Sequence, residues 1–207
     1  MATIKELMTQ LEDEALLAEV RKQLEEGISP SEIVSQCQEG MSEVGNLFSE
    51  GQLFVSDLMM AGSICKDVTE LVRPYIKKDD HASALGKVII GTVKDDIHDI
   101  GKDIVCNMLE AAGFEVIDLG VDVQPETFVK ALQEHKCKVL GLSCLLASCY
   151  GSIKETITAI GEAGLRDQVK IIVGGGPIDE HVVAYAGADA YSASAQDTVN
   201  YCKEVLC

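Results

Sequence analysis

The chain has 207 residues, 47% of them apolar, enough for one large or two small domains with buried cores. Asp and Glu outnumber Lys and Arg by 34 to 17, and the formal charge of −17 argues against nucleic acid or an anionic membrane surface as a partner. No apolar stretch reaches the roughly 18 residues that a membrane span needs. The N-terminus has the pattern of a helix start, not of a signal sequence, so we expect a soluble, cytoplasmic protein.

Apolar residues recur at helical spacing through the first part of the chain. One set predicts a helix that ends at Gly27 and contains Leu7, Leu11, Leu16, Leu17, Val20 and Leu24. Pro30, placed just after Ser29, is typical of the first turn of a second helix. A third helix is expected from about Phe54 and should end before Pro74. Amphipathic helices joined by short turns predict a helical bundle.

From residue 87 onward, short runs rich in Val, Ile and Leu alternate with helical patterns, which predicts a parallel, doubly wound sheet. Strands are expected at 87–93, 115–119, 138–143, 169–174 and 189–192. Helices are expected at about 101–112, 125–135, 151–164, 178–186 and 196–205. We therefore predict a helical cap domain over 1–78, a linker over 79–86, and a flavodoxin-like (Rossmann-like) α/β domain over 87–207.

The eight cysteines show no C-x-x-C pair and no zinc-knuckle spacing. Most lie inside apolar segments, which is typical of reduced, buried thiols in a cytosolic protein.

A histidine follows the first predicted strand, where open α/β sheets bind ligands. Asp96 precedes His98 by two residues and could accept the second ring N–H, an arrangement that orients a metal-bound imidazole. Gly101 leaves space at the start of the next helix.

Two further segments follow the third and fourth predicted strands, Ser143–Leu145 and Gly174–Pro177. Each alone is weak evidence, since a lone histidine is more often structural and a glycine run is usually a turn. Carboxyl ends of parallel strands share one edge, so the three segments could line one crevice.

Together the segments D-x-H-x-x-G, S-x-L and G-G, with 41 residues between Gly101 and Ser143 and 28 between Leu145 and Gly174, resemble the cobalamin-binding signature of methionine synthase and its relatives. Those relatives include corrinoid proteins of methanol, methylamine and aromatic methyl-ether demethylation.

The resemblance implies that cobalamin binds with its nucleotide tail detached from cobalt and inserted beside the sheet. His98 would replace the tail as lower axial ligand of cobalt, and Asp96 would tune His98. Residues that would contact the tail or the lower face of the corrin ring are Asp95, Ile97, Asp99, Gly101, Ser143, Leu145, Ala147, Gly174, Gly175 and Ala195.

One position departs from the methionine synthase pattern. A serine that extends the Asp–His pair there corresponds to Cys149 here, with Ser148 beside it. A thiol is a weaker hydrogen-bonding partner than a hydroxyl, so either Ser148 substitutes or the relay is shorter.

The stretch from Val44 to Leu58 resembles the methyl-carrier cap that covers the upper face of the corrin. By this resemblance Phe48, Val55 and Leu58 would form an apolar lid, although periodicity alone would place all three in the bundle core.

A protein of this type is expected to shuttle a methyl group by cycling between cob(I)alamin and methylcobalamin. It would accept methyl from a substrate-specific methyltransferase of the methyl-ether, methylamine or methanol type, and pass it to a second methyltransferase acting on tetrahydrofolate or a thiol coenzyme such as coenzyme M. A reductive activase is a further expected partner. The chain would be a carrier subunit without a complete active site of its own.

Three other readings are weaker. A phospho-receiver domain has a similar architecture but needs an aspartate at the end of the third strand, where this chain has Ser143. A cobalamin-dependent regulator would carry a DNA-binding module, and the acidic charge opposes DNA. A cobalamin mutase subunit lacks this kind of N-terminal bundle.

Overall fold

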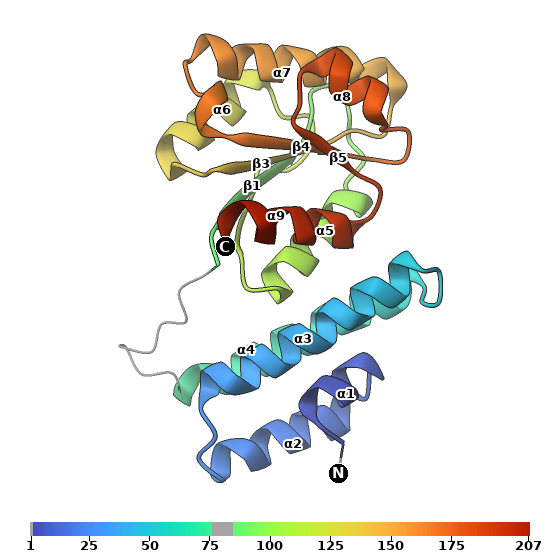
Figure 1. Cartoon of the computed structure of the whole chain (residues 1–207), viewed down its shortest axis with the longest axis vertical. Coiled ribbons are helices and arrows are strands. Elements are labelled where there is room, and N and C mark those ends of the chain that lie inside the picture. The colour runs from blue at the N-terminus through green and yellow to red at the C-terminus, as the bar shows by residue number, and fades with distance from the viewer. Residues whose placement is uncertain (1, 76–84) are drawn as a thin grey trace. The chain divides into compact units, whose positions relative to one another are not determined.

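The computed structural model describes residues 2–75 and 85–207, and it divides into two compact units (Figure 1). The first is Met1–Ala84 together with Ala111–Gly113, and the second is Leu85–Glu110 together with Phe114–Cys207. Most of the predicted linker, 79–86, lies outside the described residues.

The first unit is built from helices, in agreement with the predicted bundle. They are α1 (Ile4–Thr9), α2 (Asp13–Glu25), α3 (Pro30–Ser49), α4 (Val55–Val72) and the short 3-10 helix η1 (Arg73–Tyr75). Ser29 caps α3 by accepting a hydrogen bond from the backbone N–H of Glu32, and Pro30 occupies the first turn as predicted. The buried side chains that join these helices include Ile4, Met8, Leu16, Val20, Ile33, Val44, Ile64 and Val68.

The prediction of one helix ending at Gly27 is wrong. The chain breaks at Leu11, whose φ of 59° is left-handed, and α1 and α2 form in place of a single helix. The short α1 lies closely against Gly40 of α3. A Cβ on Gly40 would come within 2.5 Å of the Met8 Cβ. The apolar period continues through Leu11, so the pattern alone gives no sign of the interruption.

The second unit is a five-stranded parallel sheet with helices on both faces. The strands are β1 (Lys87–Thr92), β2 (Glu115–Asp118), β3 (Val139–Ser143), β4 (Lys170–Gly174) and β5 (Ala190–Ser192), in the order β2-β1-β3-β4-β5. The helices are α5 (Ile100–Ala111), α6 (Pro125–His135), α7 (Tyr150–Glu162), α8 (Glu180–Ala186) and α9 (Ala195–Leu206), with 3-10 turns η2 (Ala147–Cys149) and η3 (Arg166–Gln168). This is the predicted flavodoxin-like class.

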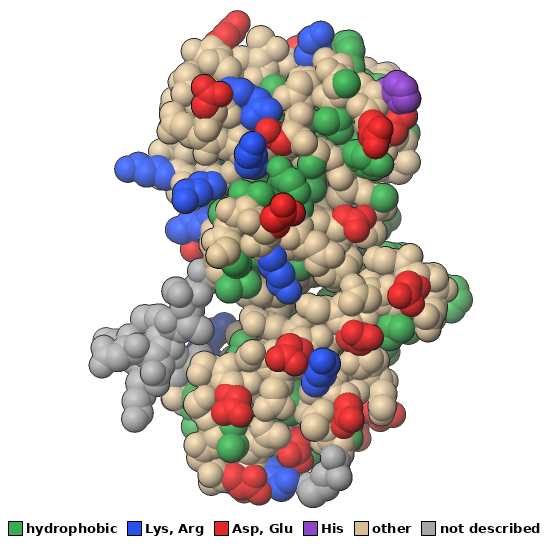
Figure 2. Space-filling model, viewed as in Figure 1, with side chains coloured by type: hydrophobic (Ala, Val, Ile, Leu, Met, Phe, Trp, Pro, Cys, Tyr) green, Lys and Arg blue, Asp and Glu red, His purple; other side chains and the backbone are tan. Residues whose placement is uncertain are grey.

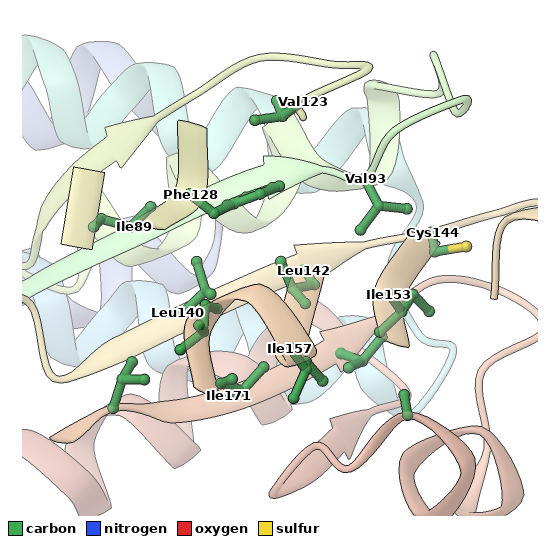
Figure 3. Close-up of a cluster of buried hydrophobic side chains, with 14 of the residues drawn as sticks. Ile89, Val93, Val123, Phe128, Leu140, Leu142, Cys144, Ile153, Ile157 and Ile171 are labelled. Carbon is green, nitrogen blue, oxygen red and sulfur yellow. The ribbon is translucent and has the colours of Figure 1, made fainter. Parts of the chain in front are cut away.

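Helices α6, α7 and α8 cover one face of the sheet, and α5 and α9 cover the other (Figure 1). Alternate side chains of the central strands point to the first of these faces, as a two-residue strand period requires. Figure 3 shows this core, in which strand residues such as Ile89, Leu140 and Ile171 pack with residues of α6 and α7, including Phe128 and Ile153.

Acidic side chains are scattered over both units on the face shown in Figure 2, among a smaller number of Lys and Arg side chains. This distribution is typical of a solvated surface and identifies no particular partner.

Candidate functional site

The chain makes a tight turn as it leaves β1. Val93 pairs with Val123 in an isolated parallel bridge, and Asp95 then takes a left-handed φ of 68°. Left-handed backbone is better tolerated by Asp than by most residues with a Cβ. The turn directs the next side chain, Asp96, inward, where it has no exposed surface.

The buried Asp96 carboxylate accepts four hydrogen bonds. Its Oδ1 accepts from His98 Nδ1 at 2.6 Å and from the His98 backbone N–H at 3.1 Å. Its Oδ2 accepts from the backbone N–H groups of Leu145 at 2.7 Å and Leu146 at 3.1 Å. Both oxygens are therefore satisfied, one by the loop after β1 and the other by the loop after β3.

These hydrogen bonds determine the protonation state of the Asp96 carboxyl group. Burial acts to raise the pKa of Asp96, but the hydrogen bonds from His98, Leu145 and Leu146 outweigh burial and hold the pKa below its ordinary value. The group is thus a carboxylate at neutral pH.

The His98 ring is fixed on one side and open on the other. With Nδ1 donating to Asp96, a neutral imidazole has its lone pair on Nε2, free to bind a metal. The side chain is 47% exposed, so a ligand can reach it. The Thr92 hydroxyl donates to the His98 carbonyl oxygen at 3.2 Å and holds the backbone behind the ring.

The edge of the sheet around His98 is unusually apolar for an exposed surface. The loops that follow β1, β2 and β3 and the first residue of α5 expose large apolar side chains: Ile97 (72%), Ile100 (73%), Val121 (38%), Leu145 (44%) and Leu146 (38%). Such an exposed set is typical of a binding surface.

A row of small residues crosses the sheet on the face covered by α5 and α9. In register these are Thr92 of β1, Ser143 of β3, Gly174 of β4 and Ser192 of β5. The Thr198 hydroxyl of α9 donates to the Ser192 hydroxyl at 2.9 Å, and both are buried. Two residues before Ser143 on β3, a Cβ on Gly141 would lie 3.2 Å from Ile90 Cγ1, so a side chain at that position would crowd Ile90.

Within the described residues, no group of three or more His, Cys, Asp or Glu side chains could hold a metal ion. The donor set at His98 is one imidazole, which fits a metal whose other ligands belong to a prosthetic group.

Comparison with known proteins decides what that group is. Two family models, each described as a B12 binding domain, match residues 86–200 and 2–73. The chain belongs to the B12-binding domain family. Cobalamin is therefore its cofactor, as predicted.

Relatives with high similarity are named trimethylamine and dimethylamine corrinoid proteins. The chain is 42% identical over 167 residues to "Trimethylamine corrinoid protein 2" of Methanosarcina mazei, covering 80% of this chain and 77% of that protein. It is 36% identical to "Dimethylamine corrinoid protein 2" of the same organism, over the full length of both.

Solved structures show the same fold. A cobalamin-binding protein from Desulfitobacterium hafniense has a TM-score of 0.86 at 34% identity, covering 99% of this chain and 97% of that one. The methanol:cobalamin methyltransferase complex MtaBC from Methanosarcina barkeri has a TM-score of 0.82 at 25% identity, covering 98% of this chain and 78% of that one.

The residues present fit cobalamin at two places. The apolar edge around His98 suits the flat corrin ring, and the row of small residues suits a narrow nucleotide tail. At the start of α9, beside the buried Ala195, Gln196 Oε1 is buried without a hydrogen-bond partner among the described residues. A polar group of a bound tail would satisfy this acceptor.

The glycines of the motif divide into two kinds. A Cβ on Gly175 would come within 1.9 Å of the Cys144 carbonyl oxygen, so the chain itself requires glycine there. A Cβ on Gly174 would lie 3.1 Å from the Ser192 hydroxyl. A Cβ on Gly101 would meet nothing within 4 Å, so only a ligand could require that glycine.

The remaining predicted site residues of the second unit lie at or after the ends of β1 and β3. Asp95, Asp99 and Ala147 are exposed at the same edge of the sheet, and Ser143 is half-buried in the row of small residues.

Neither Ser148 nor Cys149 hydrogen-bonds to the Asp96 carboxylate, so the side-chain relay ends at Asp96, as in the second sequence alternative. Cys149 Sγ points to the Asp95 carbonyl oxygen at 3.4 Å, and the Ser148 hydroxyl lies 3.8 Å from Cys149 Sγ. The place of the third member is taken by the Leu145 and Leu146 backbone N–H groups. Backbone donors leave no residue-type signal in a sequence, and so the contact from Leu146 could not be predicted.

The predicted cap residues have different surroundings in the helical unit. Val55 is 41% exposed, Phe48 is half-buried and Leu58 is 2% exposed. Phe54 and Met59, near the start of α4, are also exposed, at 78% and 60%.

Among the described residues, none of the helices combines the length and the apolar character needed to cross a membrane.

Proposed function

We propose that this protein carries a methyl group on cobalamin between two methyltransferases, with His98 as the lower axial ligand of cobalt. The observation that supports this most directly is the 2.6 Å contact between His98 Nδ1 and the buried Asp96 carboxylate, which leaves Nε2 free at an accessible, apolar edge. When bound, cobalamin supplies a cobalt that takes up a methyl cation in its Co(I) state and yields it to a nucleophile.

The similarity to trimethylamine and dimethylamine corrinoid proteins favours a methylamine as the methyl source over a methyl ether or methanol. The donor would be a methylamine:corrinoid methyltransferase. The acceptor would be a second methyltransferase that methylates a thiol coenzyme or tetrahydrofolate, and a reductive activase would restore the reduced cofactor.

The chain's own residues have three tasks in this scheme. Asp96 holds the imidazole in the tautomer and direction needed for ligation. The apolar loops around it exclude water from the lower face of the corrin. The exposed apolar residues at the start of α4, including Val55, would shelter the methyl group together with the half-buried Phe48, and the buried Leu58 would support them from within the helical unit.

Cobalamin reconstitution tests the role of His98. Protein loaded with hydroxocobalamin and reduced to the cob(II)alamin state should show, by electron paramagnetic resonance, splitting from one imidazole nitrogen. His98→Ala should retain the corrinoid but lose that splitting.

His181→Ala is the matched control. His181 also follows an aspartate by two residues and lies 3.5 Å from Asp179 Oδ2, but it is 96% exposed on α8. It should keep the wild-type spectrum. A wild-type protein that binds the corrinoid without nitrogen splitting, or His98→Ala with unchanged splitting, would contradict the proposal.

A transfer assay tests the methyl source. Protein in the cob(I)alamin state is mixed with trimethylamine, dimethylamine, methanol or a methyl ether and with the matching methyltransferase. Loss of the cob(I)alamin absorption should occur with a methylamine, whereas transfer from methanol or the ether alone would overturn the choice of methylamine.

A further inference from the structure

The loop after β2 is joined to the end of β1 by backbone pairing. The Thr92 backbone N–H donates to the Gly120 carbonyl at 2.9 Å, and the Val123 N–H donates to the Thr92 carbonyl at 3.0 Å. The segment 119–123 therefore runs beside the turn that leads to His98.

Asp122 makes a reciprocal contact with that turn. Its carboxylate Oδ1 accepts from the Asp95 backbone N–H at 2.8 Å, and its own backbone N–H donates to the Asp96 carbonyl at 2.9 Å. Both Asp95 and Asp122 have left-handed φ, 68° and 51°. The two left-handed turns at Asp95 and Asp122 are thus joined to one another by hydrogen bonds.

All four backbone polar groups of Asp95 and Asp96 have a partner. The Asp95 carbonyl accepts from Cys149 Sγ at 3.4 Å, and the Asp96 N–H donates to the Val93 carbonyl at 3.2 Å. Asp122 is the partner of the remaining two groups, the Asp95 N–H and the Asp96 carbonyl. The direction of the Asp96 side chain is set by this backbone, and the His98 ring is set by Asp96.

We propose that Asp122 is a positioning residue for the lower ligand, which acts by fixing the Asp95–Asp96 backbone. This inference rests on the proposed role of His98. Asp122 itself is exposed and needs no contact with the cofactor.

The test compares three variants. Asp122→Ala removes the acceptor and disfavours left-handed backbone, Asp122→Gly removes only the acceptor, and Asp122→Asn retains both features. Asp167→Ala, at an exposed position in η3, controls for the loss of one negative charge.

The measurement is the ratio of imidazole-ligated to unligated cob(II)alamin, from the nitrogen splitting in electron paramagnetic resonance, alongside the dissociation constant for hydroxocobalamin. Loss of a group that hydrogen-bonds a metal ligand directly costs about 10- to 100-fold. Asp122 acts one step further out, through the Asp95–Asp96 backbone, so Asp122→Ala and Asp122→Gly should lower the ligated ratio several-fold, up to about 10-fold. Asp122→Asn and Asp167→Ala should stay close to wild type.

Wild-type ratios in Asp122→Gly would overturn the inference, and so would an equal loss in Asp167→Ala. If Asp122→Ala does not fold, Asp122→Gly decides the question, because glycine accepts the left-handed turn. A wild-type protein without nitrogen splitting would instead contradict the role of His98, so the two failures are distinguishable.

Discussion

Gly175 and Gly101 lie at the same edge of the sheet but are glycine for different reasons. Gly175 has a φ of 139° and lies against the backbone of Cys144, whereas Gly101 faces open space. The fold requires glycine at position 175, whereas no neighbouring atom of the chain requires glycine at position 101.

Alanine at these two positions should separate stability from binding. Gly175→Ala should lower the free energy of unfolding by about 2–4 kcal/mol, because the new Cβ meets a backbone carbonyl. Gly101→Ala should leave the free energy of unfolding within about 0.5 kcal/mol or raise it, because alanine favours helix, yet weaken cobalamin binding. Urea denaturation without cobalamin and titration with hydroxocobalamin measure the two effects, and an unstable Gly101→Ala variant would contradict this assignment.

At this scale the sequence was informative wherever a side chain carries the chemistry. The spacing of Asp96 and His98 predicted their contact, and the structure shows it. The contacts from Leu145 and Leu146 could not be predicted, because every residue except proline offers the same backbone N–H.

At the scale of the elements, boundaries follow local signals where such signals exist. Strand and helix ends in the second unit fall within a few residues of the predicted ones. The break at Leu11 has no glycine or proline to mark it, and the short α1 before it packs against Gly40, a contact distant in sequence.

The C-terminal end of α6 allows a test of how much left-handed backbone lowers the free energy of unfolding. Lys136 ends α6 with φ 51° and ψ 40° and is exposed. Lys136→Gly should raise the free energy of unfolding by about 0.5–1 kcal/mol, because glycine adopts this conformation without strain. Lys138→Gly, also exposed but without positive φ, should lower it by a similar amount. Urea denaturation of both variants checks the opposite signs, and a loss of stability in Lys136→Gly would contradict the reasoning.

At the scale of the whole molecule, all eight cysteines are free thiols, and seven are buried in the two cores. Burial raises the pKa of Cys106, Cys144 and Cys202 to about 12. These thiols are protonated at neutral pH and inaccessible, and thiolates are the reactive form.

A thiol-labelling experiment should therefore find one fast cysteine. With a disulfide reagent at neutral pH, the native protein should show one rapid phase from Cys207, which is exposed, and the other seven should react after denaturation in urea. Cys207→Ser should remove the rapid phase. Two or more fast thiols in that variant would mean that one of the cores opens readily.

Overall composition and periodicity predicted two kinds of fold in the right order along the chain, a helical part and then an α/β part. The resemblance of three short motifs to a known family predicted the cofactor. Which residues approach the upper face of the corrin could not be read from periodicity, since the same apolar residue can serve a core or a lid.

The two carboxylate oxygens of Asp96 make this position unusually sensitive to substitution. One oxygen serves the imidazole and the other serves two amides from a different loop, so the side chain connects two segments about 50 residues apart in sequence. An asparagine offers one oxygen and one NH₂ group, and either orientation turns a donor toward a donor. Aspartate to asparagine is ordinarily a mild substitution. Asp96→Asn would nevertheless lose the hydrogen bonds to one of the two segments, whichever way the amide is oriented.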